Sequence, residues 1–269
     1  MWRRFALLAI FSVVLTTLLA ACAETPQVTR PPVKLHVAEA ADQAAVLDRV
    51  ARNYMQEHEW VTVDTKSIVP ADAAALVHSG QIDAAIVHAA PDPKEKLWVS
   101  GLAYDPIALI VHPTNPISNV TLAQLSDLFQ GRTFDWTPFG GNGEVIPVSR
   151  EAEAQSRQLF EDRVMQRRAV TRNAILKSSA QDVIDFVAQT PGAIGYVPLS
   201  HVDDRVKAIE IEGVAPTVET AANGKYVLTT PLYLIAQSEP LGDLREFVAW
   251  LLGNEGQTLL STQGLGRVK

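Results

Sequence analysis

Residues 105–136 read DPIALIVHPTNPISNVTLAQLSDLFQGRTFDW, which in order predicts a buried strand, a turn and an amphipathic helix. The strand is expected over 106–111, because this run is apolar and rich in β-branched residues and is followed by Pro113 and Pro116. Thr121 is a suitable helix N-cap and Gly131 a suitable stop. Between them, apolar residues recur at helical spacing, at Leu122, Leu125, Leu128 and Phe129.

The same alternation of strand and helix extends in both directions from this stretch. Short apolar or β-branched runs predict strands at 33–37, 61–63, 82–87, 145–148, 193–197, 206–211 and 226–236. Helical spacing predicts helices at about 42–58, 71–79, 151–166 and 179–189, with two more at the C-terminus. Asp42 is expected to cap the first, and Ser179 followed by Asp182 forms a capping-box pattern. Strands alternating with helices predict an α/β fold.

The N-terminus has the pattern of an export signal. Arg3 and Arg4 precede an apolar stretch over 5–20 that is shorter than the roughly 20 residues needed to span a bilayer. Leu19-Ala20-Ala21-Cys22 closes this stretch and resembles the lipobox of bacterial lipoproteins. The resemblance implies a signal peptide over 1–21, cleavage before Cys22, and attachment of fatty acyl chains to Cys22. Residues 22–32 then form a lipidated, proline-rich tether that holds the chain outside the cytoplasm at the membrane.

Composition excludes several function classes for the remaining chain. Cys22 is the single cysteine, so no disulfide and no thiolate site is expected in the domain that follows. The net charge of −7 and the pI near 5.4 argue against nucleic acid as a partner. The six histidines are scattered without metal-ligand spacing, and no nucleophile elbow, phosphate loop or dinucleotide fingerprint is present. We therefore expect no metal, no cofactor, no catalytic residue and no enzymatic activity.

Several segments together resemble the phosphate-type family of periplasmic solute-binding proteins. Besides 105–136, they are GAIGYVPLSHVDDRVKAIEIEGVAPT at 192–217, NGKYVLTTPLYLIA at 223–236, and LREFVAWLLGNEGQTLLSTQGLGRV at the C-terminus. The resemblance implies the type II fold of such proteins, with two α/β lobes joined by two crossing hinge strands near 106–111 and 228–236. Lobe one would comprise 33–106 and 227–269, and lobe two 107–226. It also implies a monomer that carries a small anionic solute to an ABC permease.

The family's ligand-binding pattern is partly present here. The family has an Arg, three residues, then Ser-Gly-Thr-Arg at a helix start, and this chain keeps Arg150, Arg157 and Phe160 in register while Ala154, Gln155 and Ser156 replace Ser-Gly-Thr. In lobe one, Gly80-Gln-Ile-Asp83 matches a Gly-x-x-Asp pattern, which implies that Asp83 faces the ligand. Glu39 and Ala40 lie where the family has a first ligand-binding turn, and Pro70 replaces a Ser donor.

These departures leave the function open between alternatives. Retained Arg150 and Asp83 favour a solute-binding protein of an ABC importer, with an inorganic oxyanion first and an organic anion second. The lost Ser-Gly-Thr pattern and Pro70 favour a sensor or interaction protein that keeps the fold without a transported ligand. Arg150 could instead pair with Glu151 or Glu153, Asp83 could pair locally, and Arg157 could be a solvated helix residue or form a salt bridge between the lobes.

Overall fold

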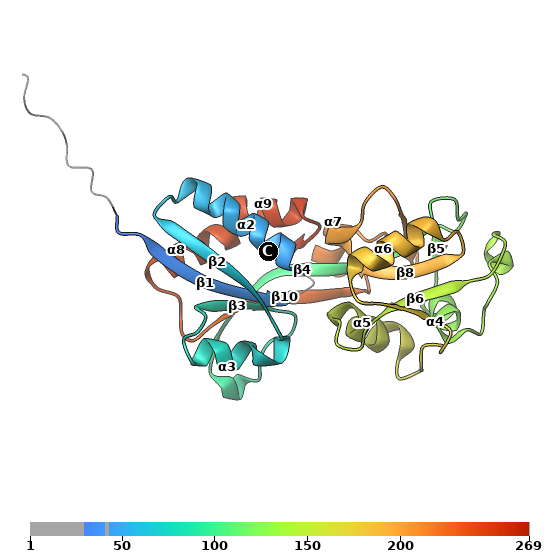
Figure 1. Cartoon of the computed structure of the whole chain (residues 1–269), viewed down its shortest axis with the longest axis horizontal. Coiled ribbons are helices and arrows are strands. Elements are labelled where there is room, and N and C mark those ends of the chain that lie inside the picture. The colour runs from blue at the N-terminus through green and yellow to red at the C-terminus, as the bar shows by residue number, and fades with distance from the viewer. Residues whose placement is uncertain (1–29, 41–42, 269) are drawn as a thin grey trace, which may run out of the picture. The chain divides into compact units, whose positions relative to one another are not determined.

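The computed structural model describes residues 30–40 and 43–268, and a sheet in the order β2-β1-β3-β10-β4-β8-β6-β7 runs through them (Figure 1). From Val33 onward the chain is one compact unit. The predicted signal peptide, Cys22 and the expected cap Asp42 lie outside the described residues, and of Ala40 only the backbone is described.

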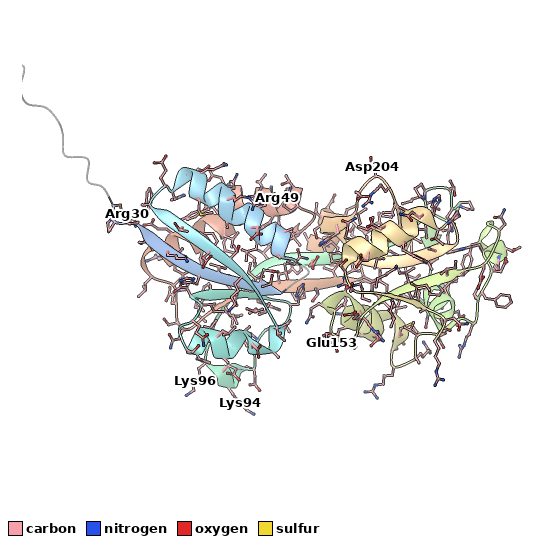
Figure 2. All side chains as sticks on the ribbon, in the orientation of Figure 1. Arg30, Arg49, Lys94, Lys96, Glu153 and Asp204 are labelled. Carbon is pink, nitrogen blue, oxygen red and sulfur yellow. The ribbon has the colours of Figure 1, made fainter. Side chains whose placement is uncertain are left out.

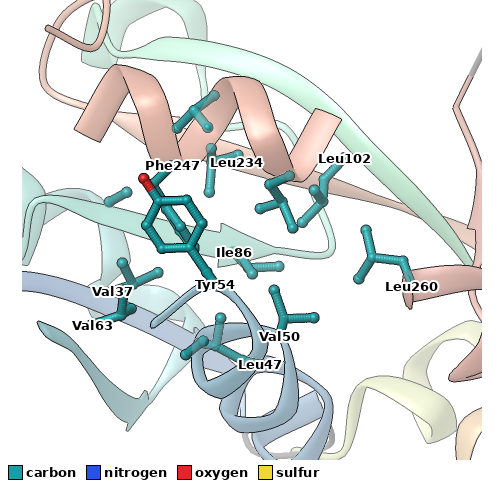
Figure 3. Packing of buried hydrophobic residues seen from close by; sticks show 14 of the residues in the cluster. Val37, Leu47, Val50, Tyr54, Val63, Ile86, Leu102, Leu234, Phe247 and Leu260 are labelled. Atoms are coloured by element: carbon teal, nitrogen blue, oxygen red, sulfur yellow. The ribbon is translucent and has the colours of Figure 1, made fainter. Parts of the chain in front are cut away.

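Lobe one has a sheet with a core on each face. β1 (Val33–Ala40) is parallel to β2 (Val61–Ile68) and to β3 (Ala84–Val87), whereas β10 (Thr229–Ala236) is antiparallel to β3. One face packs against α2 (Ala44–Glu57), α8 (Gly242–Leu252) and α9 (Asn254–Thr262), as Figure 3 shows. The other packs against α3 (Ala73–His78). Successive strand side chains point to opposite faces, so Val37 joins the first core and Ala38 the second.

Lobe two repeats this layered arrangement. Its strands are β8 (Ala193–Pro198), β6 (Ile146–Arg150), β7 (Ile175–Lys177), β9 (Lys207–Ile211) and β5 (Asn119–Val120). One core contains α4 (Leu122–Gln130) and α5 (Gln155–Phe160), which continues as a π-helical turn over Glu161–Met165. The other core contains α6 (Ala180–Gln189). The short helix α7 (Val218–Ala222) contacts β4 and β11 (Gly266–Arg267).

The long strand β4 (Trp98–Val111) joins the two lobes (Figure 1). It pairs with β10 from Trp98 to Pro106 and with β8 from Ile107 to Val111. The chain returns beside it, because Ile107 N–H donates to the Leu228 carbonyl oxygen at 2.8 Å just before β10 begins. We call this place, where β4 changes partner and the chain returns into β10, the crossing.

The observed elements differ from the predicted ones mainly where burial is partial. β4 starts at Trp98 rather than 106, because its first residues alternate between half-buried and exposed and show no continuous apolar run. The helix predicted at 151–166 starts at Gln155 and ends in the π-helical turn, and the strand predicted from 226 starts at Thr229. The three-residue strand β7 and the helix α7 were not predicted.

The helix caps follow the sequence signals more closely. Thr121 Oγ1 accepts from Gln124 N–H at 3.2 Å while Gln124 Oε1 accepts from Thr121 N–H at 2.8 Å, and Gly131 ends α4 with a φ of 72°. Ser179 Oγ accepts from Asp182 N–H at 3.1 Å and donates to Asp182 Oδ2 at 2.7 Å. The Asp182 carboxylate thus engages the hydroxyl of the cap in place of the backbone N–H that a full capping box uses.

Candidate functional site

Strand directions bring one polar edge of each lobe toward the crossing. β10 starts at the crossing and is antiparallel to β3, so the carboxyl ends of β3 and its parallel neighbour β1 lie on that side of lobe one. In lobe two, β8 is antiparallel to β4 with Pro198 opposite Ile107, so β8 and the parallel β6 also end at the crossing. Ligands of open α/β sheets bind outside the carboxyl ends of strands. The crossing is therefore where a site is expected.

Arg150 brings a buried positive charge to this edge. It is the last residue of β6 and only 4% exposed. Its Nη2 donates to the Ser178 carbonyl oxygen at 3.1 Å, in the segment that follows β7. Because a guanidinium has five N–H donors in a rigid plane, a group held in this way is well suited to bind an oxyanion.

The first turn of α5, which begins five residues after Arg150, contributes a hydroxyl. Ser156 is 2% exposed, and no hydrogen-bond partner of its Oγ occurs among the described residues. A buried hydroxyl without a partner costs about 1–3 kcal/mol, which a bound ligand could recover. Arg157 acts differently from Arg150, because its Nε pairs with Glu161 Oε1 at 2.8 Å and its Nη1 donates to the Arg150 carbonyl oxygen at 2.8 Å. Arg157 therefore braces the backbone of Arg150 from within lobe two.

Tyr196 is buried next to Arg150 in the chain fold and stabilises this part of the site through its hydroxyl group and its ring. Its hydroxyl lies 2.7 Å from Ser149 Oγ, and Arg150 N–H donates to it at 3.4 Å. Its ring stacks on Phe160 with 4.2 Å between centroids. Burial raises the pKa of the Tyr196 hydroxyl, which keeps it protonated. Tyr196 and Trp136 are both fully buried in this core.

In lobe one, Glu39 lies near the carboxyl end of β1 and is 1% exposed. Its Oε1 accepts from Ser67 Oγ at 3.2 Å. It lines a pocket of about 130 Å3 between β1, β2 and α2, together with Ala44, Asp48, Thr65, Lys66 and Ser67. Ala40 ends β1 at the same edge. The resemblance implied a ligand-binding turn at Glu39 and Ala40, but both residues belong to strand β1, and the Glu39 carboxylate is buried there.

A second buried carboxylate at the crossing was not among the residues selected from the sequence. Asp105 of β4 is 2% exposed, and its Oδ2 accepts from Gln43 Nε2 at 2.6 Å and from His88 Nε2 at 3.2 Å. Gln43 directly precedes α2, and His88 directly follows β3. One signal could have revealed the group, because Asp105 is a charged residue at the start of the apolar run that crosses between lobes.

Asp83 does not join this site. It precedes β3 at the amino end of the strand, where its Oδ2 accepts from His36 N–H at 2.7 Å. Its side chain is exposed and lines a separate pocket of about 200 Å3 with Gln237, Glu239 and Leu241, beyond the carboxyl end of β10. The Gly-x-x-Asp resemblance implied that Asp83 faces the ligand, but the structure places its carboxylate one strand length away from the edge that faces the crossing.

Across 30–40 and 43–268, no group of three or more His, Cys, Asp or Glu side chains is placed to hold a metal ion. Within the same ranges, no helix has the length and apolar character to cross a membrane.

Comparison with known proteins identifies the superfamily to which this fold belongs. A family model described as a PBP superfamily domain matches residues 25–255. A phosphate-binding protein PstS of Bacillus subtilis is 24% identical over 222 residues, which are 80% of this chain and 74% of the relative. Another, from Borreliella burgdorferi, is 22% identical over 180 residues, and the aligned part is 64% of that relative.

Two solved structures agree with this. A substrate-binding protein with bound phosphate from Clostridium perfringens, assigned provisionally to a phosphate ABC transporter, is 26% identical with a TM-score of 0.77 over 88% of this chain and all of the other. An ABC-type phosphate transport receptor of Vibrio cholerae, 24% identical, has a TM-score of 0.72 over 87% of this chain and 99% of the other. The predicted two-lobed α/β fold with two crossing strands is confirmed, and the chain belongs to the PBP superfamily.

Proposed function

We propose that this chain is the solute-binding protein of an ABC importer and captures a small solute with an oxyanion group between its two lobes. The relatives named as phosphate-binding proteins and the Clostridium neighbour with bound phosphate support a phosphate-like anion. We take lobe one as 33–106 plus 227–269 and lobe two as 107–226, because β4 changes partner between Pro106 and Ile107. Binding would close the lobes about β4 and β10, and the permease would recognise the closed form.

The observation that carries this proposal is the buried Arg150 at the edge of lobe two that faces the crossing. Arg150 is 4% exposed, its Nη2 donates to the Ser178 carbonyl oxygen, and it lies at the carboxyl end of a strand, where ligands of such sheets bind. A guanidinium at such an edge can hold an anion without transforming it. We accordingly propose binding and not catalysis, with a monomer as the binding unit.

A thermal-shift and calorimetric screen tests this proposal. The purified chain is exposed to phosphate, sulfate, molybdate, tungstate and small organic acids at low salt. A ligand at 100 times its dissociation constant should stabilise the protein by about 2.7 kcal/mol. Arg150→Ala should weaken binding at least about tenfold, since a hydrogen bond to a charged group contributes about 1.5–3 kcal/mol. Arg163→Ala, which removes an exposed arginine of the same lobe, is the control.

The outcomes separate the two functions that the sequence left open. Binding of one anion that depends on Arg150 and not on Arg163 supports a transport role. If no compound of the screen stabilises the protein, the sensor or interaction role becomes the better account. If a ligand binds as tightly to Arg150→Ala as to the unchanged protein, the site lies elsewhere.

We further propose that Cys22 anchors the protein to the outer face of the membrane next to the permease. The lipobox resemblance at 19–22 supports this, although these residues lie outside the described part of the chain. Several acyl chains hold a protein at a membrane stably, whereas one does not. Cys22→Ser should therefore move the protein from the membrane fraction to the soluble extracytoplasmic fraction. Protein that stays in the membrane fraction would contradict the anchor.

A further inference from the structure

The segment that follows the start of the π-helical turn carries a run of positive charge that the proposed solute site does not use. Residues 163–181 contain no acidic residue, although the whole chain has 30 of them and a net charge of −7. The basic residues of this run are Arg163, Arg167, Arg168, Arg172 and Lys177. A surface on which both signs are mixed has no strong field, whereas a cluster of one sign attracts oppositely charged partners.

Three of these arginines form what we call the arginine cluster, which comprises Arg167, Arg168 and Arg172. All three are exposed, and their guanidinium groups make no ion pair or hydrogen bond within the part of the chain that the structure describes. Arg163 is also exposed, but the exposed Asp162 directly precedes it and offsets its charge. The arginine cluster is therefore the uncompensated part of the run.

The fold holds the arginine cluster at the outer end of lobe two, away from the crossing. β7 starts three residues after Arg172 and is parallel to β6, whose carboxyl end lies at the crossing, so the amino end of β7 lies at the opposite end of the lobe. Thr171 N–H donates to the Phe129 carbonyl oxygen at 2.8 Å, which fixes this segment to the end of α4. Asp127 of that helix does not neutralise the cluster, because it pairs with Arg132 at 3.4 Å.

An exposed aromatic side chain lies at the same end of lobe two. Phe134 is 72% exposed, and its carbonyl oxygen accepts from Val145 N–H at 2.9 Å, directly before β6 begins at Ile146. The loop that contains Phe134 meets the arginine segment, because a Cβ at Gly131 would lie 3.1 Å from Thr171 Oγ1. An aromatic ring near basic side chains is the combination found where proteins meet the membrane–water interface.

The partner that fits this surface is an anionic lipid bilayer. Guanidinium groups bind phosphate through two parallel hydrogen bonds, and an exposed ring can lie among lipid headgroups. An acidic protein would also match the arginines, but the proposed anchor at Cys22 already brings the chain to a membrane. The eleven residues 22–32 span at most about 40 Å when extended, which lets the folded part touch the same bilayer.

We propose that the outer end of lobe two contacts an anionic membrane surface, with the arginine cluster on lipid phosphates and Phe134 among the headgroups. Because the crossing lies at the other end of lobe two, this contact leaves the proposed solute site uncovered. It is a second, reversible contact beside the anchor at Cys22, so it orients the folded part relative to the bilayer. The inference does not depend on which solute the protein carries.

Vesicle sedimentation tests this contact without the acyl anchor. The chain from residue 23 onward contains the whole compact unit that begins at Val33, and it is mixed with phosphatidylcholine vesicles with and without about one-third phosphatidylglycerol. Although the protein is acidic, it should bind the anionic vesicles and not the neutral ones. Added salt should weaken binding, because salt screens exposed charges. No binding to anionic vesicles at low salt overturns the proposal and favours an acidic protein as the partner.

Two triple variants with the same change in net charge locate the surface. Binding should weaken about a hundredfold in the variant that carries Arg167→Gln, Arg168→Gln and Arg172→Gln, because each arginine near an anionic surface contributes about fivefold. The control variant removes three positive charges at exposed positions of lobe one, which Figure 2 labels, and should bind within about tenfold of the unchanged protein. Its changes are Arg49→Gln, Lys94→Gln and Lys96→Gln. Equal losses in the two variants overturn the assignment to lobe two.

Phe134→Ala tests the aromatic part of the contact separately. It should weaken binding about fivefold or more at every salt concentration, because the loss of apolar contact is not screened by ions. Leu241→Ala removes a side chain that is 75% exposed in lobe one and should leave binding unchanged. All variants change exposed residues, so equal thermal unfolding shows that each is folded. Unchanged binding by Phe134→Ala overturns the insertion of the ring.

Discussion

At the scale of single residues, Tyr226 and Tyr196 support lobe two through hydroxyl groups that must remain protonated. Tyr226 Oη donates to the Ile107 carbonyl oxygen at 3.0 Å, and burial raises the pKa of both tyrosines. A raised pKa in the folded state means that the contribution to stability is complete below the unfolded value of about 10 and is lost as the pH rises above it. The free energy of unfolding should therefore fall above about pH 10.

Urea unfolding between pH 8 and 11, values chosen to bracket the usual tyrosine pKa of about 10, measures this dependence. Tyr226→Phe should make the alkaline decline shallower, whereas Tyr104→Phe, at a partly exposed position, should leave it unchanged. An equally steep decline in Tyr226→Phe would show that other groups cause it.

Ser149 and Tyr196 form a buried hydroxyl pair whose energy can be isolated. Ser149 is fully buried and its Oγ lies 2.7 Å from the Tyr196 hydroxyl. Tyr196→Phe leaves Ser149 without this partner and should destabilise the fold by about 1–3 kcal/mol. The double change Tyr196→Phe with Ser149→Ala should cost less than the sum of the two single changes, because both polar groups are then removed. Strict additivity in a urea unfolding cycle would contradict this coupling.

At the scale of elements, β8 approaches α6 closely because residue 195 is glycine. A Cβ at Gly195 would lie 2.7 Å from Val183 Cγ1 and 3.4 Å from Val187 Cγ2, so Gly195→Ala should destabilise the protein by about 1–3 kcal/mol. Adding Val183→Ala should restore part of the loss. Gly101→Ala is the matched control, since its Cβ would meet Val268 at an ordinary 3.7 Å. If thermal unfolding showed that Gly101→Ala destabilises the protein more than Gly195→Ala does, this account of the packing would be contradicted.

At the scale of the whole molecule, β4 and β10 connect the two lobes, and the lobes could close about these two strands when a ligand binds. The two strands pair with each other through Pro106, and beyond it β4 pairs with lobe two. A ligand held by groups of both lobes stabilises the closed form by its differential affinity. Small-angle X-ray scattering should show a smaller radius of gyration when the ligand saturates the protein. Arg150→Ala should need a higher ligand concentration to reach the same decrease, and an unchanged radius of the unaltered protein at saturation would exclude closure.

The sequence by itself determined the α/β class, the buried strand at 106–111 and the residues at the two ends of α4. Each of these depends on local patterns: an apolar β-branched run between prolines, helical spacing, and a Thr before the helix with a Gly after it. The position of Arg150 followed from its register with a known family motif. These features were predictable because their physical causes lie within a few neighbouring residues.

Only the tertiary structure decided which carboxylates lie at the crossing. Asp105 is 62 residues from Gln43 and 17 from His88, and the three meet because α2, β3 and β4 are brought together by the sheet. Asp83 precedes β3 and His88 follows it, so strand direction sends one to the outer end of lobe one and the other to the crossing. Spacing along a strand cannot distinguish these ends, because each is defined by the neighbours with which the strand pairs.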